Sequence, residues 1–195
     1  MSNDKNKDTV VKMPLARVAF ADIYEMNDKG KYSVTLIFEK GIDLSEFKQM
    51  CQKVVQTTWP DKAKRPKLKS PIKDANEPNQ SGTIPATEWG FGDSFFLRTT
   101  SKFPPVFYDK KGNITERPDI YPGCYAFAAI QPFTYSKDGN SGVSTSAVAM
   151  QFQKDGERMA GGRPEVGHMF GGGAEDSGTG VDNPQNYQSE SDDFI

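Results

Sequence analysis

The sequence predicts a mainly β domain, a small barrel or sandwich with one helical insertion, followed by an acidic tail. Three observations lead to this prediction. Apolar and polar residues alternate with a period of two along much of the chain, whereas a single stretch has helical periodicity. The final residues 165–195 contain no lysine or arginine. One amphipathic helix among five or more predicted strands is typical of a small barrel or sandwich.

The first predicted element is a hairpin. Residues 15–25 have strand character, and Asn27-Asp28-Lys29-Gly30 supplies turn chemistry in which Gly30 takes a positive φ angle. In residues 31–39 apolar side chains alternate with polar ones, and one face carries Tyr32, Val34, Leu36 and Phe38. The pattern predicts a half-buried antiparallel strand whose other face, with Lys31, Ser33 and Thr35, stays polar.

One amphipathic helix is predicted after this hairpin. Asp43 and Glu46 have the spacing of a capping box. Apolar residues then recur at intervals of three and four, at Leu44, Phe47, Met50, Cys51, Val54 and Val55. The residue before Pro60 is pushed away from helical geometry, so we expect the helix to end at Trp59. Cys51 lies on the apolar stripe, which predicts a buried and unreactive thiol.

The remaining strands are predicted after a long irregular region at residues 62–92, and loops of that length are usually functional. Strand signals resume at 94–101 and 106–108, and two longer strands are expected at 121–135 and 143–153. Most aromatic residues of a β protein lie in its core. Those expected in this core are Phe38, Phe47, Phe95 or Phe96, Phe127 and Phe152.

The charge distribution divides the chain. Residues 165–195 hold seven of the 26 acidic residues, whereas all 24 lysines and arginines precede them, so the body is basic and the tail acidic. The Gly-rich tail has too few apolar residues to offset chain entropy, and we expect it to be disordered. The predicted organisation is a flexible leader at 1–13, a folded domain at 14–164 and the tail at 165–195.

Several function classes find no support in the residues. The single histidine, His168, lies beyond the last predicted strand, and two distant cysteines exclude the common zinc spacings. No phosphate-binding loop motif is present, so we predict no catalytic residues, no metal and no cofactor. No apolar run approaches the about 20 residues that span a bilayer. With a polar start and only two cysteines, an intracellular protein without membrane contact is expected.

The basic and aromatic residues together predict an interface for single-stranded nucleic acid, which combines cations for phosphates with rings for bases. Residues 62–73 contain no acidic residue. The predicted phosphate contacts are Lys62, Lys64, Arg65, Lys67 and Lys69, with Lys31, Arg98 and Lys137 along the same groove. The predicted stacking residues are Trp59, Trp89, Phe91, Tyr108 and Tyr135. The ordinary alternatives are core aromatics and a solvated lysine-rich loop.

The tail suggests a second role. An acidic segment tethered to a basic groove competes with nucleic acid at a high effective concentration. When nucleic acid displaces it, its end can be bound by other proteins, and the predicted contacts are Asp192, Asp193, Phe194 and Ile195.

Short stretches in a particular order carry a family resemblance. They are Arg17-Val18-Ala19-Phe20, residues 30–37, Tyr121-Pro122-Gly123-Cys124-Tyr125, residues 142–157, Gly161-Gly162-Arg163 and residues 170–176. Together with the acidic end, they resemble the OB-fold single-stranded DNA-binding proteins of tailed bacteriophages. The chain departs from that family in ending on Ile195 rather than on an aromatic residue. Its helix also follows the second strand instead of coming late in the barrel.

The resemblance implies an OB-like five-stranded barrel that binds single-stranded DNA without sequence preference. It also implies roles in replication, recombination and repair of a phage genome, in the cytoplasm of the infected bacterial host. The tail would then contact a phage or host polymerase or helicase. The alternatives are a structural, assembly or interaction protein of a phage, or an RNA-binding OB module, and a homodimer stays open.

Overall fold

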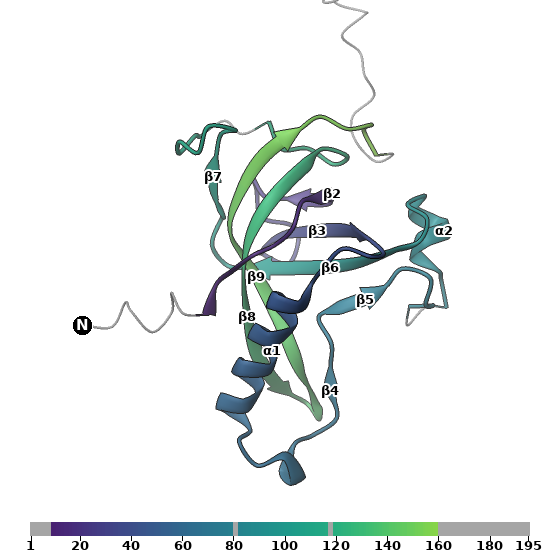
Figure 1. Cartoon of the computed structure of the whole chain (residues 1–195), viewed down its shortest axis with the longest axis vertical. Coiled ribbons are helices and arrows are strands. Elements are labelled where there is room, and N and C mark those ends of the chain that lie inside the picture. Colours follow the sequence, from purple (N-terminus) through teal and green to yellow (C-terminus); the bar gives the residue numbers. More distant parts are fainter. Residues whose placement is uncertain (1–8, 80–81, 117–118, 160–195) are drawn as a thin grey trace, which may run out of the picture. The chain divides into compact units, whose positions relative to one another are not determined.

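The computed structural model describes residues 9–79, 82–116 and 119–159, and Figure 1 shows how their elements are arranged. The helices are α1 (Ser45–Thr58), the 3-10 helix η2 (Lys62–Lys64) and α2 (Pro85–Trp89). The long strands are β2 (Ala16–Asp22), β3 (Tyr32–Glu39), β6 (Ser94–Ser101), β8 (Tyr125–Lys137) and β9 (Asn140–Lys154). The short strands are β1 (Val11–Lys12), β4 (Leu68–Lys69), β5 (Ile72–Asp74) and β7 (Val106–Tyr108).

The five long strands form an OB-like barrel. Antiparallel pairing joins them in the order β9-β8-β2-β3-β6. Four antiparallel steps leave β6 and β9 running in the same direction, and the barrel closes between them. At this closure the Thr145 hydroxyl donates to the Arg98 carbonyl oxygen over 3.2 Å. The predicted mainly β fold with an inserted helix is therefore confirmed, as is the hairpin with Gly30 at a φ of 63°.

The central strand β3 is buried on both faces, which overturns the expected polar face. Val34, Leu36 and Phe38 lie in the main core, as predicted from the alternation. Ser33 and Thr35 on the other face are each only 3% exposed. This face is covered because a second apolar cluster, which includes Ile37 of β3, forms over its outer side. The buried Ser33 hydroxyl is satisfied by donating a hydrogen bond to Asp22 Oδ2 at 2.8 Å.

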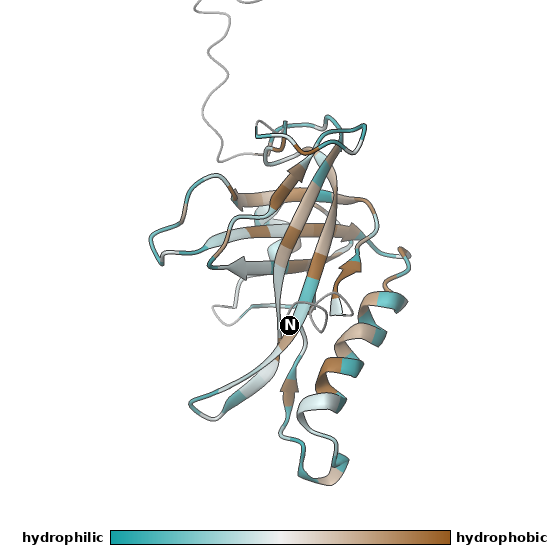
Figure 2. Cartoon of the chain, turned by 90° about the vertical axis from the view of Figure 1, so that its left-hand side faces the viewer, coloured by the Kyte–Doolittle hydropathy of each residue, from teal (hydrophilic) through white to brown (hydrophobic). Residues whose placement is uncertain are grey.

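Helix α1 packs its apolar stripe against β8 and β1 beside the barrel, and its apolar and polar residues alternate in Figure 2. Phe47 and Val55 are its buried residues. The predicted capping box is wrong, because the helix begins at Ser45 with Leu44 as the flanking residue and without a side-chain cap bond. Asp43 instead accepts a hydrogen bond from the Ser45 N–H at 2.8 Å. No helix in the described part of the chain is long and apolar enough to cross a membrane.

The predicted leader extends too far into the chain. Val11 and Lys12 form β1, where Val11 pairs with Ile130 and Lys12 with Ala129 of β8. Val11 is 2% exposed and Met13 is 1% exposed, so residues 11–13 belong to the barrel. The apolar-polar-apolar pattern is too short to predict a strand by itself, and it becomes one only by pairing with β8. Residues 1–8 lie outside the described part of the chain.

The predicted core aromatics are confirmed in part. Phe38, Phe47 and Phe96 are buried. Phe127 and Phe152 are half-buried, and the Lys12 ammonium lies 4.3 Å from the centre of the Phe127 ring. An aromatic ring on the outward face of β8 is thus covered by a cation rather than by the core.

Gly123 provides a test of the packing after β9. The φ angle of Gly123 is +113°, and a Cβ added there would lie 2.1 Å from the Glu157 carbonyl oxygen. Both features require glycine at this position. Gly139 has a φ of +76° but open space around it. We expect Gly139→Ala to lower the free energy of unfolding by about 1 kcal/mol. Gly123→Ala should lower it by about 1–3 kcal/mol more through overpacking.

Thermal unfolding of both glycine variants checks this comparison. Equal losses of melting temperature would show that residues 155–159 move aside without cost, contrary to close packing of Glu157 against Gly123.

Candidate nucleic-acid interface

Four aromatic rings form a contiguous cluster on the outer side of β3 and β6. Trp89 lies at its centre, with ring centroids 5.0 Å from Phe20, 5.4 Å from Phe91 and 5.2 Å from Phe96. Pro85 starts the short helix α2 in its first turn, and Gly90 ends it in the left-handed conformation. The local sequence therefore sets Trp89 on a defined turn above the sheet.

Phe20 is held in an unusual backbone conformation at the edge of this cluster. The register between β2 and β3 shifts between Ala19 and Asp22, which places Phe20 in a β-bulge. Its φ of 47° is uncommon for a residue other than glycine, yet its side chain is 46% exposed. Bulges and strained residues of this kind concentrate at functional sites, where they re-aim a side chain. The fold thus keeps the Phe20 ring exposed to solvent while the ring packs against Trp89.

A groove of about 690 Å³ runs beside the cluster. We call it the aromatic groove, and its defining residues are Phe20, Lys69, Lys73, Trp89, Arg98 and Tyr135. They come from β2, β4, β5, α2, β6 and β8, so the closed barrel brings distant parts of the sequence together. Rings and cations thus line one continuous surface.

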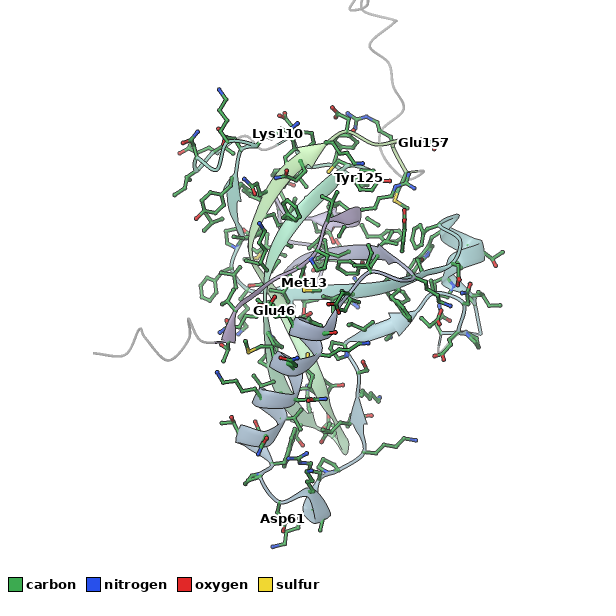
Figure 3. The ribbon with its side chains drawn as sticks, viewed as in Figure 1. Met13, Glu46, Asp61, Lys110, Tyr125 and Glu157 are labelled. Carbon is green, nitrogen blue, oxygen red and sulfur yellow. The ribbon has the colours of Figure 1, made fainter. Side chains whose placement is uncertain are left out.

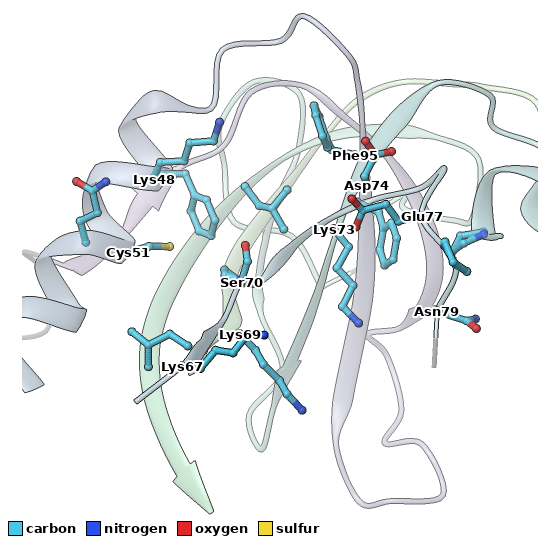
Figure 4. Close-up of a pocket in the computed structure, with 18 residues that line it drawn as sticks. Lys48, Cys51, Lys67, Lys69, Ser70, Lys73, Asp74, Glu77, Asn79 and Phe95 are labelled. Atoms are coloured by element: carbon cyan, nitrogen blue, oxygen red, sulfur yellow. The ribbon is translucent and has the colours of Figure 1, made fainter. Parts of the chain in front are cut away.

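Residues 62–74 form a strap between α1 and the barrel, which begins with η2 and continues as extended chain. β4 pairs with β9 and β5 pairs with β6, which ties the strap to the sheet at both places. Two further hollows of about 850 Å³ and 540 Å³ lie between the strap and α1. Figure 4 shows the larger one, with Cys51 of α1 pointing toward the strap. Lys69, Ser70 and Pro71 line all three hollows.

Ion pairs hold the β5 end of the strap. The Lys40 ammonium lies 3.1 Å from Asp74 and 2.7 Å from Asp93. A hydrogen bond from the Asn76 N–H, together with Lys40, holds the pKa of the Asp74 carboxyl below its ordinary value. The Lys40 ammonium likewise lowers the pKa of Asp93. Both carboxylates therefore stay ionised and paired at neutral pH.

Four of the predicted contact residues come together in the aromatic groove. They are Lys69, Trp89, Arg98 and Tyr135. Phe91 touches Trp89 in the cluster but does not line the groove. Four of the predicted contact residues therefore share one groove.

Most side chains of the basic run line the hollows between the strap and α1 and not the aromatic groove. Lys62 and Arg65 line the 540 Å³ hollow, and Lys67 lines the 850 Å³ hollow. Lys64 lines neither hollow and is paired with Asp61 at 3.5 Å. The single groove expected from the sequence is therefore divided by the strap.

The other predicted residues lie elsewhere. Tyr108 on β7 lines a separate hollow with Lys110, Lys111 and Phe152. In Figure 3 this Lys110 turn lies at the opposite end of the view from Asp61, where the basic run begins. Trp59, Lys31 and Lys137 lie outside the linings of the aromatic groove and of both α1 hollows. The lysines that neighbour Tyr108 in sequence are the only feature that predicts it as a contact.

Two residues that line the aromatic groove, and one beside it, are not among the contacts predicted from the sequence. Phe20 lies in a predicted strand, and no periodicity reveals that a bulge turns it outward. Lys73 belongs to the basic run but is not among the predicted phosphate contacts. Phe133 is 42% exposed and pairs with Ser144, which lines the aromatic groove. Its shared parity with Tyr135 on β8 was the available signal.

Other chemistry finds little support at these hollows. Burial raises the pKa of the half-buried Cys51 thiol to about 11, in line with the unreactive thiol predicted from the sequence. In residues 9–79, 82–116 and 119–159, no three histidine, cysteine or carboxylate side chains group as metal ligands would.

Comparison with known proteins adds a family and a shared fold. The family model described as "Enterobacter phage Enc34, ssDNA-binding protein" matches residues 9–179. "Putative protein p50" of Acyrthosiphon pisum secondary endosymbiont phage 1 is 27% identical over 165 residues, covering 78% of this chain and 87% of that protein.

Solved structures agree in fold at low identity. The single-stranded DNA-binding protein from bacteriophage Enc34 in complex with ssDNA superposes with a TM-score of 0.63 at 16% identity, over 81% of this chain and 96% of that chain. Gp2.5, a single-stranded DNA-binding protein encoded by bacteriophage T7, gives a TM-score of 0.54 at 12% identity, over 80% and 97% of the two chains.

Proposed function

The chain belongs to the family of the single-stranded DNA-binding protein of Enterobacter phage Enc34, and we propose that its aromatic groove binds single-stranded DNA without sequence preference. The observation that carries this proposal is the combination of exposed rings and cations on one surface. Phe20 and Tyr135 offer ring faces, and Lys69, Lys73 and Arg98 offer positive charge. Every base has a π-face, so stacking on these rings tolerates any sequence.

The fold holds the groove in a binding-ready arrangement. The bulge and the contact with Trp89 restrict Phe20, and the Lys69 ammonium donates to Asn140 Oδ1 at 2.8 Å. The backbone of Arg98 is fixed in β6, paired with Thr35 of β3. Side chains that are already ordered lose little entropy when DNA binds, which leaves more of the stacking and charge energy for affinity.

The biological setting follows from the family and from the sequence. The family is one of DNA-binding proteins, and we assign this chain a binding role rather than a catalytic one. We place it in replication, recombination and repair of a phage genome, in the cytoplasm of the infected host. Residues 165–195 lie outside the described part of the chain. Their charge supports competition with DNA for the basic body, and recruitment of a polymerase or helicase through Asp192, Asp193, Phe194 and Ile195.

Ring removal tests the location of the site. Phe20→Ala and Tyr135→Ala should each weaken oligo-dT binding by about 1–3 kcal/mol, because each removes one stacking partner. Tyr108→Ala is the control, since it removes a tyrosine that lines a separate hollow. Fluorescence anisotropy of a labelled oligonucleotide measures the affinities. A loss for Tyr108→Ala as large as for Tyr135→Ala would move the site to β7.

Charge removal tests the phosphate contacts and the substrate. Lys73→Gln and Arg98→Gln should each reduce the slope of log affinity against log salt by about 0.7, as expected for one phosphate contact on a single strand. Oligo-dT should bind more tightly than a matched duplex in the same titration. Equal affinity for the duplex would contradict the proposal, and tighter binding of oligo-U would indicate an RNA-binding protein.

Truncation tests the tail. A chain ending at Gly173 should bind oligo-dT more tightly at low salt, because it lacks six of the seven acidic residues of the tail and still contains every groove residue. Removing residues 192–195 alone should leave most of the DNA affinity and abolish binding to the replication partner. Unchanged affinity of the chain ending at Gly173 at low salt would rule out competition by the tail.

A further inference from the structure

A second basic hollow adjoins the aromatic groove. It is the 540 Å³ hollow between α1 and the strap, which we call the helix groove. Its cations are Lys62, Arg65 and Lys69, and no carboxylate stands among the described residues that line it. Positive charge without a compensating acid favours an anionic ligand at this place.

The helix groove and the aromatic groove share one border. Lys69, Ser70, Pro71 and Val143 line both of them. The Lys69 ammonium is positioned at this border by its hydrogen bond of 2.8 Å to Asn140 Oδ1. An anionic chain that leaves the aromatic groove therefore meets a fixed cation as it crosses the strap.

The chemistry of the helix groove differs from that of the aromatic groove. Gln52 and Gln56 offer amide donors one helical turn apart on α1, and no aromatic residue is part of its described lining. The Arg65 Nε donates to the Trp59 carbonyl oxygen at 2.6 Å, which restricts the guanidinium group while its terminal N–H groups can still donate. Arginine and glutamine donors of this kind contact phosphate oxygens and carry no information on base identity.

The larger hollow along the strap is a poorer continuation for DNA. Asp74 and Glu77 line it together with its lysines. Carboxylates beside the path repel phosphates, so the favourable direction from Lys69 leads to Lys62 and Arg65.

We propose that single-stranded DNA bound in the aromatic groove continues across the strap into the helix groove. There the backbone phosphates are held by Lys62 and Arg65, without stacking. This two-part site rests on the proposed function of the aromatic groove. It assigns a ligand, the phosphodiester backbone of the same strand, to a hollow that base stacking cannot use.

A length series of oligo-dT tests the second subsite. Lys62→Gln and Arg65→Gln each remove one of the two cations that the helix groove does not share with the aromatic groove, and Lys64→Gln is the matched control. Lys64 belongs to the same 3-10 helix as Lys62 but lines neither groove and is paired with Asp61. Affinities are measured at about 0.1 M salt, where one phosphate contact on a single strand contributes about five-fold.

The expected result depends on oligonucleotide length. The shortest oligonucleotides that bind should have equal affinity for the wild-type protein and for all three variants. Above a threshold length the wild-type protein and Lys64→Gln should gain affinity, and Lys62→Gln and Arg65→Gln should each fall behind by about five-fold. Lys62 is exposed, so its variant retains the fold even if loss of the Arg65 contact to Trp59 lowers stability.

Two outcomes would overturn the inference. Equal losses for Lys62→Gln at every length would place Lys62 in the first subsite. No loss at any length would leave the helix groove without DNA, as expected if it takes an acidic peptide instead. Failure of the aromatic groove itself is distinguishable, because Phe20→Ala would then leave binding of the shortest oligonucleotides unchanged.

Discussion

The barrel closes where β6 lies beside β9, and the candidate interface depends on this closure. The buried Thr145 of β9 bonds to the carbonyl oxygen of Arg98 on β6, so the outward side chain of Arg98 reaches the same groove as Ser144 and Tyr135. The strap pairs with one strand on each side of the closure, β4 with β9 and β5 with β6. Cations separated by more than twenty positions in sequence therefore line one surface.

The aromatic cluster serves both the fold and the interface. Phe96 is 8% exposed and packs with Ile37 and Ala75, whereas Phe20 at the other side of Trp89 is 46% exposed. A base stacked on the exposed ring would extend a row of aromatic contacts that begins in the apolar cluster. Burial in the apolar cluster thus fixes Trp89 in place. The same packing offsets the backbone strain of the positive φ angle at Phe20.

Local patterns predicted much of this molecule. The turn at Gly30, the helix and the long strands each follow from periodicity or turn chemistry, and the family confirms the predicted class of single-stranded DNA-binding protein. Non-local features could not be read in this way. Alternation in β3 cannot reveal a cover over its second face, and a bulge at Phe20 breaks the parity on which facing is predicted. Tyr108 has lysines close to it in sequence, yet β7 and the turn after it line a hollow separate from the aromatic groove.

The central claim is that bases stack in the aromatic groove on the closed barrel. Photocrosslinking of oligo-dT that carries a photoreactive thymine analogue, followed by peptide mass spectrometry, tests it most directly. Crosslinks are expected at Phe20, Trp89 and Tyr135, on three segments far apart in the chain. Crosslinks confined to Tyr108 and Phe152 would contradict it and would place the DNA beside β7.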